Sequence, residues 1–396
     1  MLRLSALKKI DPVAPLVTAG HFTHHLCTGV LVAVLPLLRD EFQLDYFRSG
    51  LLVSAYNVVD GVAQVPMGRL ADRFDKKLLL PLGLWMVALS AMAIGLSNSY
   101  FMVVVLLMIM GLVSGIQHPT AVALLSEYFP KNRARAFGLN MIGGSASFLT
   151  IYPLAGLIAN AAGWRWAYLL LPIPALLTGL LFWRIMRGRE PEEVTQSLSP
   201  GQGRHAGPSI PVWQGLRLIG VVLIISVLSR MLTSGTVPLL SLYLVDKHGV
   251  APTLAGPMMG LIYGAGIVGA PLSGVLSDRL GRKAVFLFCV AALGPLILLI
   301  TLAPSPLALL PIFILLGMAM QGREPPLQSL VAEAVPQEQR ATMMGVYFFL
   351  SMEMGGLSSP LTGFLMEQLG ADRAFTYLAL GAIALSAVIW LVRKKV

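Results

Sequence analysis

The sequence contains little charge and almost no cysteine. Charged residues make up 12% of its 396 positions, whereas soluble domains usually contain about a quarter. Water is therefore not the main solvent of this chain. The two cysteines, Cys27 and Cys289, both fall within long apolar runs. This argues against a disulfide framework, and we expect both thiols to act as packing residues.

Sequence motifs of enzymes and ATP-driven pumps are also missing. We find no nucleophile elbow, no phosphate-binding loop and no H-E-x-x-H pair, so we expect neither catalysis nor a cofactor. A substrate-sensing membrane receptor stays open as an alternative from a different class. The polar stretch over 187–215 is, however, too short to hold a signalling domain.

The chain is instead rich in long apolar runs. Hydrophobic residues make up 56% of it, its mean hydropathy is +0.76, and a helix needs about 20 apolar residues to cross a bilayer. Runs of this length recur between short polar breaks and predict an all-α membrane protein with twelve transmembrane helices. Their limits are 13–38, 49–68, 78–97, 101–126, 136–160, 165–186, 216–245, 253–275, 284–303, 306–333, 341–366 and 374–392.

The basic residues alternate from loop to loop. The 29 Lys and Arg exceed the 19 Asp and Glu, which by itself would suggest a nucleic-acid partner. Most of them, however, fall in every second loop, as in 69–77, 131–135 and 279–283. By the positive-inside rule these loops and both termini are cytoplasmic, so we expect a multi-pass inner-membrane protein and no nucleic-acid partner. The apolar run after the basic start is too long for a signal peptide, and we expect a retained first span.

An internal repeat relates the two halves of the chain, with an offset of about 206 residues. We expect two six-helix bundles, 1–186 and 216–396, joined by a cytoplasmic linker over 187–215 that is rich in Pro, Gly, Ser and charge. Six spans return the chain to the same side, so the halves share one orientation and a pseudo-twofold axis along the membrane normal. The repeat aligns Gly50 with Gly256, Gly156 with Gly363, Asp40 with Asp246, His24 with Arg230, and His118 with Glu324.

Two equivalent loops carry the same motif. Residues 68–77 read GRLADRFDKK and residues 274–283 read GVLSDRLGRK. Both resemble the major facilitator signature G-x-x-x-D-R-x-G-R-K, from which the first copy departs at Asp75. The resemblance extends over essentially the whole chain and implies the major facilitator fold with alternating access. We expect these loops to act as a conformational latch, formed by Gly68, Asp72, Arg73, Gly274, Asp278 and Arg279.

A second set of segments resembles one branch of that family. Gln117-His118-Pro119 followed by AVALLSEYFP, together with GHFTHH around His21, is similar to the fosmidomycin-resistance and related drug-efflux branch. Two features of proton antiporters are altered. Residues 152–157 read YPLAGL instead of G-P-x-x-G-G, and Gly111 stands where many antiporters have an arginine. These departures argue against ordinary drug/proton antiport.

Ionisable and amide side chains inside the apolar runs are costly, and they are therefore candidates for function. In the family, the first, fourth, seventh and tenth spans line the central cavity. The carboxylates suit proton sites, because a low dielectric favours their neutral form, and the histidines suit proton relays. The arginines suit an anionic substrate group or a resting partner for Glu324. The candidate cavity residues are His21, His24, His25, Asp60, Gln117, His118, Arg230, Arg323, Glu324 and Glu353.

These patterns predict a proton-coupled secondary transporter, a monomer in the lipid bilayer, that exports a small organic solute of anionic or amphiphilic character. Two other interpretations stay open. His21, His25, Asp60 and His118 are ligand types that suit transition metals, so a metal or metal-chelate carrier of the same fold is an alternative. The same side chains are also compatible with hydrogen-bonded packing and structural ion pairing.

Overall fold

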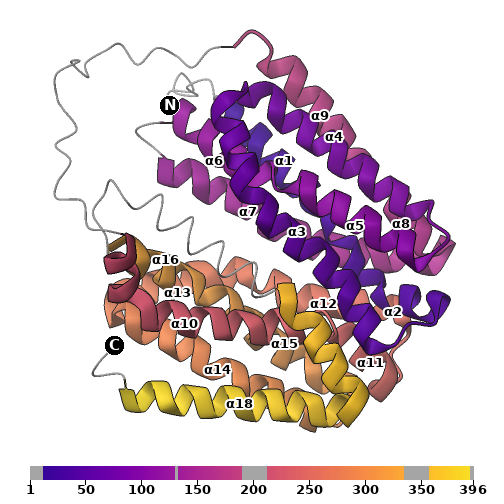
Figure 1. Cartoon of the computed structure of the whole chain (residues 1–396), viewed down its shortest axis with the longest axis vertical. Helices are drawn as coiled ribbons and strands as arrows, with labels where there is room; N and C mark the ends of the chain where they lie inside the picture. The colour runs from indigo at the N-terminus through magenta and orange to yellow at the C-terminus, as the bar shows by residue number, and fades with distance from the viewer. Residues whose placement is uncertain (1–11, 130–132, 190–211, 334–355, 393–396) are drawn as a thin grey trace, which may run out of the picture.

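The computed structural model describes residues 12–129, 133–189, 212–333 and 356–392, and the elements in these ranges are α-helices. Figure 1 shows them as two bundles. The first contains α1 (Val13–Thr28), α2 (Val30–Phe42), α3 (Tyr46–Arg73), α4 (Lys76–Gly95), α5 (Tyr100–Ser114), α6 (Gln117–Tyr128), α7 (Arg133–Ala162), α8 (Trp164–Leu170) and α9 (Ile173–Met186). The second contains α10 (Val212–Thr236), α11 (Leu240–His248), α12 (Pro252–Gly264), α13 (Gly266–Leu280), α14 (Arg282–Leu302), α15 (Pro306–Gly322), α16 (Glu324–Glu333), a helix over 356–369, and α18 (Ala371–Val392).

Membrane spans account for most of these helices. Among the described residues, eight helices or continuous helix pairs are long and apolar enough to cross a bilayer, and α10 with α11, bent by 44°, makes nine. The helices α3 and α18 also have the length, with 28 and 22 residues. The predicted eleventh span, 341–366, lies largely outside the described residues. The predicted domain limits stay a prediction, because the linker over 190–211 lies outside them too.

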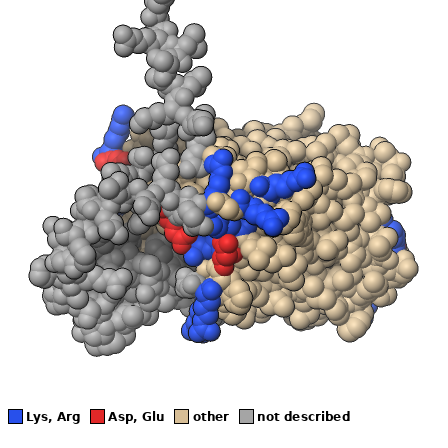
Figure 2. All heavy atoms as spheres, turned by 90° about the horizontal axis from the view of Figure 1, so that it is seen from above, with Lys and Arg blue, Asp and Glu red and all other residues tan. Residues whose placement is uncertain are grey.

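The outer surface is apolar, as a bilayer requires. Large side chains such as Phe101, Phe288 and Leu307 are about three-quarters exposed, which would be unfavourable in water and is favourable against lipid. Figure 2 shows Lys, Arg, Asp and Glu mainly near the middle of the view, and a broad area to their right with few charged residues. The charge-poor composition is therefore explained by a surface that faces hydrocarbon.

Hydrogen bonds define the two ends of the bundles. At one end, Lys77 and Tyr128 donate to the Arg189 carbonyl, just beyond the end of α9. We call it the linker end. At the other, which we call the far end, Arg165 donates to the Ser97 carbonyl and to Glu41. The order of the helices gives the same two ends, because each span carries the chain from the linker end to the far end or back.

Among the described residues, six spans are interrupted, and four of the breaks fall in spans that the repeat aligns, one with seven and four with ten. Span four breaks between α5 and α6, just before Pro119, and span ten breaks between α15 and α16, just before Pro325. Proline has no N–H to donate to the residue four positions earlier, so it weakens the helix there. Span one is interrupted at Gly29, and span seven bends before Leu240, next to Pro238. Spans six and eight are interrupted as well, between α8 and α9 and between α12 and α13.

The two halves meet at the far end through equivalent glycines. A Cβ at Gly156 would lie closer than 3 Å to the Thr253 carbonyl oxygen of the other half, and one at Gly363 would lie equally close to the Tyr46 carbonyl oxygen. Both contacts pair one element of the first half with one of the second. The glycine pairs of the repeat therefore permit close contact between the halves, and they occur twice, as a pseudo-twofold axis requires. In Figure 1 the bundles approach each other around α2, α11 and α12 and lie farther apart toward the linker end.

Each half is braced at the far end by an ion pair, and the two pairs have opposite polarity. In the first half, the Arg165 guanidinium donates to both Glu41 carboxylate oxygens at 2.8 and 2.6 Å. At the equivalent positions of the second half, Lys247 Nζ lies 2.5 Å from Asp372 Oδ1. The repeat has thus kept the ion pair while its charges were exchanged.

We predict that charge exchange in the first half is tolerated only as a pair. Arg165→Asp places a carboxylate opposite Glu41 and should lower the melting temperature by a few degrees, because an exposed ion pair is worth up to about 1 kcal/mol. Glu41→Lys combined with Arg165→Asp recreates the polarity of the second half and should restore most of the loss. A thiol-reactive dye can report unfolding, since Cys27 and Cys289 are both free and buried.

The matched control is the same exchange in the second half, Lys247→Glu with Asp372→Lys. It should also be more stable than Asp372→Lys alone. The interpretation is wrong if either double variant melts no higher than its charge-reversed single variant.

Candidate transport site

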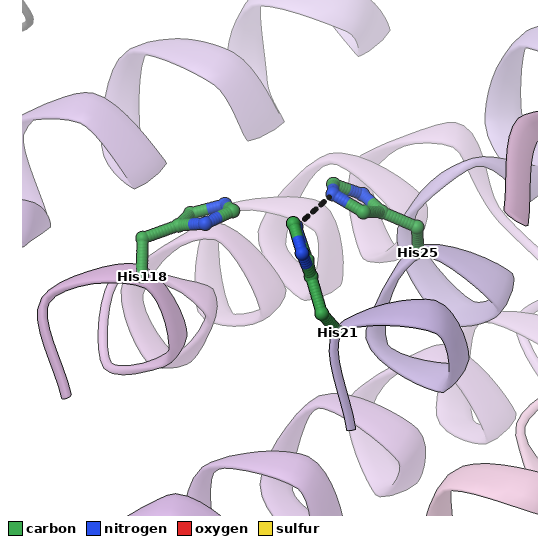
Figure 3. A group of neighbouring side chains, drawn as sticks. All are labelled: His21, His25 and His118. Atoms are coloured by element: carbon green, nitrogen blue, oxygen red, sulfur yellow. Dashed lines mark hydrogen bonds between the residues drawn. The ribbon is translucent and has the colours of Figure 1, made fainter. Parts of the chain in front are cut away.

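Four histidines of the first half form one cluster. His21, His24 and His25 lie on α1, and His118 lies in the first turn of α6. The ring centroids of His21 and His118 are 5.2 Å apart, and those of His25 and His118 are 5.8 Å apart. Figure 3 shows His118 approaching the two α1 rings from the opposite helix. The spacing of three and four residues on α1 brings its imidazoles to one face, and the break before Pro119 brings the fourth.

A directed hydrogen-bond chain connects part of this cluster. His21 Nδ1 lies 2.8 Å from the Asn140 carbonyl oxygen, so it must carry the proton and donate. In the neutral ring, His21 Nε2 is then an acceptor, and His25 Nε2, 3.1 Å away, donates to it. His25 Nδ1 in turn accepts from the Thr28 hydroxyl at 3.3 Å. The carbonyl at one end thereby fixes the tautomers of both rings.

The remaining polar groups of the cluster are more deeply buried. His24 Nε2 lies 3.2 Å from the Ser114 hydroxyl, which contacts the Tyr56 hydroxyl at 2.8 Å. Within the described part of the chain, neither His24 Nδ1 nor the amide of Gln117 has a hydrogen-bond partner, although Gln117 is only 2% exposed. Buried amides without partners are costly. These atoms are therefore places where water or a ligand group would be stabilised.

The second half carries a cluster of charges at the equivalent break. Arg230 of α10 donates to Glu324 Oε1 at 2.6 Å, and Arg323 Nε lies 3.4 Å from the same oxygen. Arg323 also donates to the Thr233 hydroxyl at 3.1 Å and is only 1% exposed. The pairing of Glu324 with an arginine, predicted from the sequence, is thus present. Among the described residues, two guanidinium groups thus lie against the Glu324 carboxylate.

The two clusters occupy equivalent positions of the repeat. Gln117-His118-Pro119 and Arg323-Glu324-Pro325 both stand where an interrupted span resumes its helix. A carboxylate is favoured in the first turn of a helix, where the exposed N–H groups carry partial positive charge. The Glu324 carboxylate therefore has both a helix N-terminus and the Arg230 guanidinium beside it.

An aromatic stack connects the histidine cluster to the second half. The His25 ring lies 4.8 Å from that of Phe148 on α7. Phe148 stacks on Tyr263 of α12 at 5.3 Å, and Tyr263 stacks on Tyr152 at 5.1 Å. Since α12 belongs to the other half, the cluster lies beside the boundary between the halves.

Other candidate residues lie apart from these clusters. Asp60 on α3 is buried but does not belong to the group of His21, His25 and His118, whose ligand atoms all lie within 4.8 Å of one another. Glu353 lies outside the described residues. Gly111 has a packing reason, because a Cβ there would lie 2.6 Å from the Tyr56 carbonyl oxygen. The arginine common in antiporters therefore does not fit between α5 and α3.

The two signature loops turn by different means. Gly281 has φ = +92°, a conformation that favours glycine, and it ends α13. Its counterpart Asp75 has an ordinary φ of −63°, and its side chain accepts from Lys77 N at 2.9 Å to cap α4. The departure from the motif at Asp75 is thus an exchange of a glycine turn for a side-chain cap.

The latch expected at these loops stays a prediction. Arg73, Asp278 and Arg279 are exposed, and the side chain of Asp72 lies outside the described residues. A Cβ at Gly68 or Gly274 would make only an ordinary contact, at 3.7 and 4.0 Å, with Pro119 and Pro325. Close helix approach therefore does not require glycine at these two positions.

Sequence analysis missed an ion cluster that joins the halves at the far end. Arg39 of α2 lies 3.1 Å from Asp40 and 2.5 Å from Asp246 of α11, so one guanidinium bridges both members of a repeat-equivalent aspartate pair. The Tyr46 hydroxyl also donates to Asp246, at 2.5 Å, and Tyr46 N donates to Glu367 at 3.1 Å. The alignment of Asp40 with Asp246 was the available signal.

A helical membrane protein made of two equivalent halves, with ionisable groups at interrupted helices beside their boundary, has the architecture of a secondary transporter. The family model for the Major Facilitator Superfamily matches residues 17–352 and 222–396. The chain belongs to that superfamily. It is accordingly a transporter and not an enzyme, and it has the major facilitator fold.

Named relatives transport different kinds of solute. The chain is 22% identical over 395 residues to the hexuronate transporter of Bacillus subtilis, covering 93% of this chain and 91% of the relative. It is 24% identical to the multidrug resistance protein MdtG of Salmonella arizonae, covering 93% and 92%. It is 28% identical to the probable sulfoacetate transporter SauU of Cupriavidus necator, covering 63% and 60%.

Solved structures match the fold over nearly the whole chain. A bacterial homologue of the human lysosomal transporter Spinster, in an inward-facing and occupied conformation, superimposes with a TM-score of 0.79 at 15% identity, covering 98% of each chain. A POT family transporter in complex with a thioalcohol-conjugated peptide gives a TM-score of 0.80 at 12% identity, covering 96% of each. At these identities the likeness concerns the fold alone.

We predict strong coupling between Arg230 and Glu324 in a double-mutant cycle. Glu324→Gln leaves the partly buried Arg230 with a weaker acceptor, which should cost about 1–3 kcal/mol and lower the melting temperature. Arg230→Met combined with Glu324→Gln removes both charges and should be more stable than Glu324→Gln alone. Additive effects of the two substitutions would show that the ion pair does not stabilise the fold.

Proposed function

We propose that this protein is a proton-coupled transporter of a small organic anion that works by alternating access. The observation that carries the proposal is the ion cluster of Arg230, Arg323 and Glu324 at the break in span ten. It combines a group that can take up a proton with two groups that can bind a carboxylate or sulfonate. Relatives named as hexuronate and sulfoacetate transporters support an anionic solute.

The coupling follows from the charges. While Glu324 is ionised, it holds Arg230. Protonation of Glu324 would release the guanidinium, and an anion would then take the place of the carboxylate. Conversely, an anion on Arg230 would leave Glu324 without its main partner and favour its protonation. Proton and anion therefore assist each other's binding, and each shifts the other's equilibrium by the same factor.

The mutual effect of proton and anion on each other's binding determines the direction of transport. Because the two bind together, the anion would be taken up with protons. Export, the direction predicted from the sequence, requires that solute and proton compete. A cationic amphiphile would compete in this way, because it is attracted to the ionised Glu324 carboxylate and protonation removes that charge. Export of an amphiphile is therefore our second candidate, supported by the MdtG relatives.

We propose that the protein is an inner-membrane monomer with both termini cytoplasmic. Exposed arginines at the linker end, such as Arg73, Arg184 and Arg279, support this orientation.

The signature loops at the linker end would act as the latch, through Asp72 and Asp278. The relation to the fosmidomycin-resistance branch stays a prediction.

The proposal predicts accumulation of an anion driven by a proton gradient. Proteoliposomes with an acidic exterior should concentrate labelled glucuronate or sulfoacetate above the equilibrium level. Glu324→Gln should abolish this accumulation, because its side chain cannot release a proton, while exchange of internal for external anion continues. The measurement is uptake with and without the gradient, together with counterflow.

The matched control is Glu127→Gln, which removes a carboxylate that pairs with Lys76 at the linker end and should leave accumulation unchanged. A Glu324→Gln variant that still concentrates either anion would contradict the coupling assignment. If wild-type vesicles move neither anion but exchange an amphiphilic dye for protons, the second candidate replaces the first.

A further inference from the structure

We propose that His21, His25 and His118 form a binding site for one divalent transition-metal ion of the Zn²⁺ class. The ligand nitrogens of these three side chains lie within 4.8 Å of one another, and within the described residues they are the group of three with this geometry. Imidazole nitrogen suits zinc and its neighbours among the transition metals. The proposal concerns the binding of metal and does not depend on the identity of the transported solute.

The two α1 rings, His21 and His25, are spaced much as two ligands of one metal ion would be. His21 Nε2 and His25 Nε2 are 3.1 Å apart and point toward each other (Figure 3). Two nitrogens that bind one tetrahedral zinc ion, each at about 2.0–2.1 Å, lie roughly 3.3 Å apart. The pair therefore already has nearly the spacing that a shared metal ion requires.

The second nitrogen of the His21 ring and of the His25 ring has a hydrogen-bond partner. Metal-binding histidines usually donate their other ring N–H to a carbonyl or hydroxyl oxygen, which fixes the tautomer and the orientation of the ring. His21 Nδ1 donates to the Asn140 carbonyl at 2.8 Å, so its Nε2 is the free lone pair. His25 Nδ1 lies 3.3 Å from the Thr28 hydroxyl, which can accept instead of donate once Nε2 binds a metal ion. The His21 and His25 rings thus each have the hydrogen-bond partner for the other ring nitrogen that a metal ligand needs.

An ion can reach the three histidines. His21 is buried, whereas His25 and His118 are partly exposed. The site differs from the set expected from the sequence, because Asp60 is not part of the group. Three neutral imidazoles do not offset the charge of a divalent ion. The fourth position would consequently be taken by an anionic oxygen, such as hydroxide or a carboxylate.

The test is zinc binding by the purified full-length protein, carrying an affinity tag without histidine and stripped with a chelator. Competition with a colorimetric chelator should show one Zn²⁺ ion per chain. His25→Gln and His118→Gln should each weaken binding at least tenfold. His248→Gln is the matched control, since His248 lies on α11 at the far end, and it should bind like the wild type.

A second measurement covers the case in which a variant does not fold. Co²⁺ bound to the wild-type protein should give the intense visible absorption of a four-coordinate site, and Zn²⁺ should bleach it. The proposal is overturned if the wild type shows no saturable binding, if His25→Gln and His118→Gln bind like the wild type, or if cobalt gives only the weak spectrum of a six-coordinate ion. His21 and His25 would then form a hydrogen-bonded pair without metal.

Discussion

The structure depends on the requirement that backbone polar groups inside a bilayer find partners within the protein. Continuous helices satisfy it, which is why the described residues are built from long apolar helices. An interruption frees carbonyl groups, and it is tolerated only where the helix is packed inside the protein. Prolines at equivalent positions, Pro119 and Pro325, impose such interruptions. The polar side chains His118 and Glu324 stand directly before these prolines, where α6 and α16 begin.

The two halves solve the same structural problem with different chemistry. At the far end, Glu41 with Arg165 and Lys247 with Asp372 brace equivalent corners with opposite polarity. At the breaks in spans four and ten, the first half presents imidazoles and the second presents the ion cluster of Arg230, Arg323 and Glu324. Under the proposed function, each half would contact a different part of an asymmetric solute. The aromatic stack of Phe148 and Tyr263 lies between these two chemistries.

Much of this organisation could be predicted from the sequence, and the omissions have physical reasons. Hydropathy and the 206-residue offset predicted the fold, and the alignment of His118 with Glu324 predicted two equivalent polar positions. A contact of Arg230 or Arg323 with Glu324 was predicted because an unpaired buried arginine would be too costly, and both arginines make it. The role of Gly111 could not be predicted, since it depends on the distance between α5 and the Tyr56 carbonyl. Nor could the exclusion of Asp60 from the histidine group, which depends on side-chain direction and not on spacing along the helix.

Alternating access requires that the far end opens as the linker end closes. The polar clusters at the breaks lie between these two ends. Double electron–electron resonance tests this most directly, with spin labels in a background that lacks Cys27 and Cys289. One label pair, at Arg48 and Gln368, spans the far end, and a second pair, at Arg187 and Leu280, spans the linker end. Without solute, the far-end distance should be short and narrowly distributed, because Arg39 and Tyr46 hold Asp246. A saturating transported solute should lengthen it and shorten the linker-end distance in the same sample, whereas distances that change in the same direction, or not at all, would contradict the account.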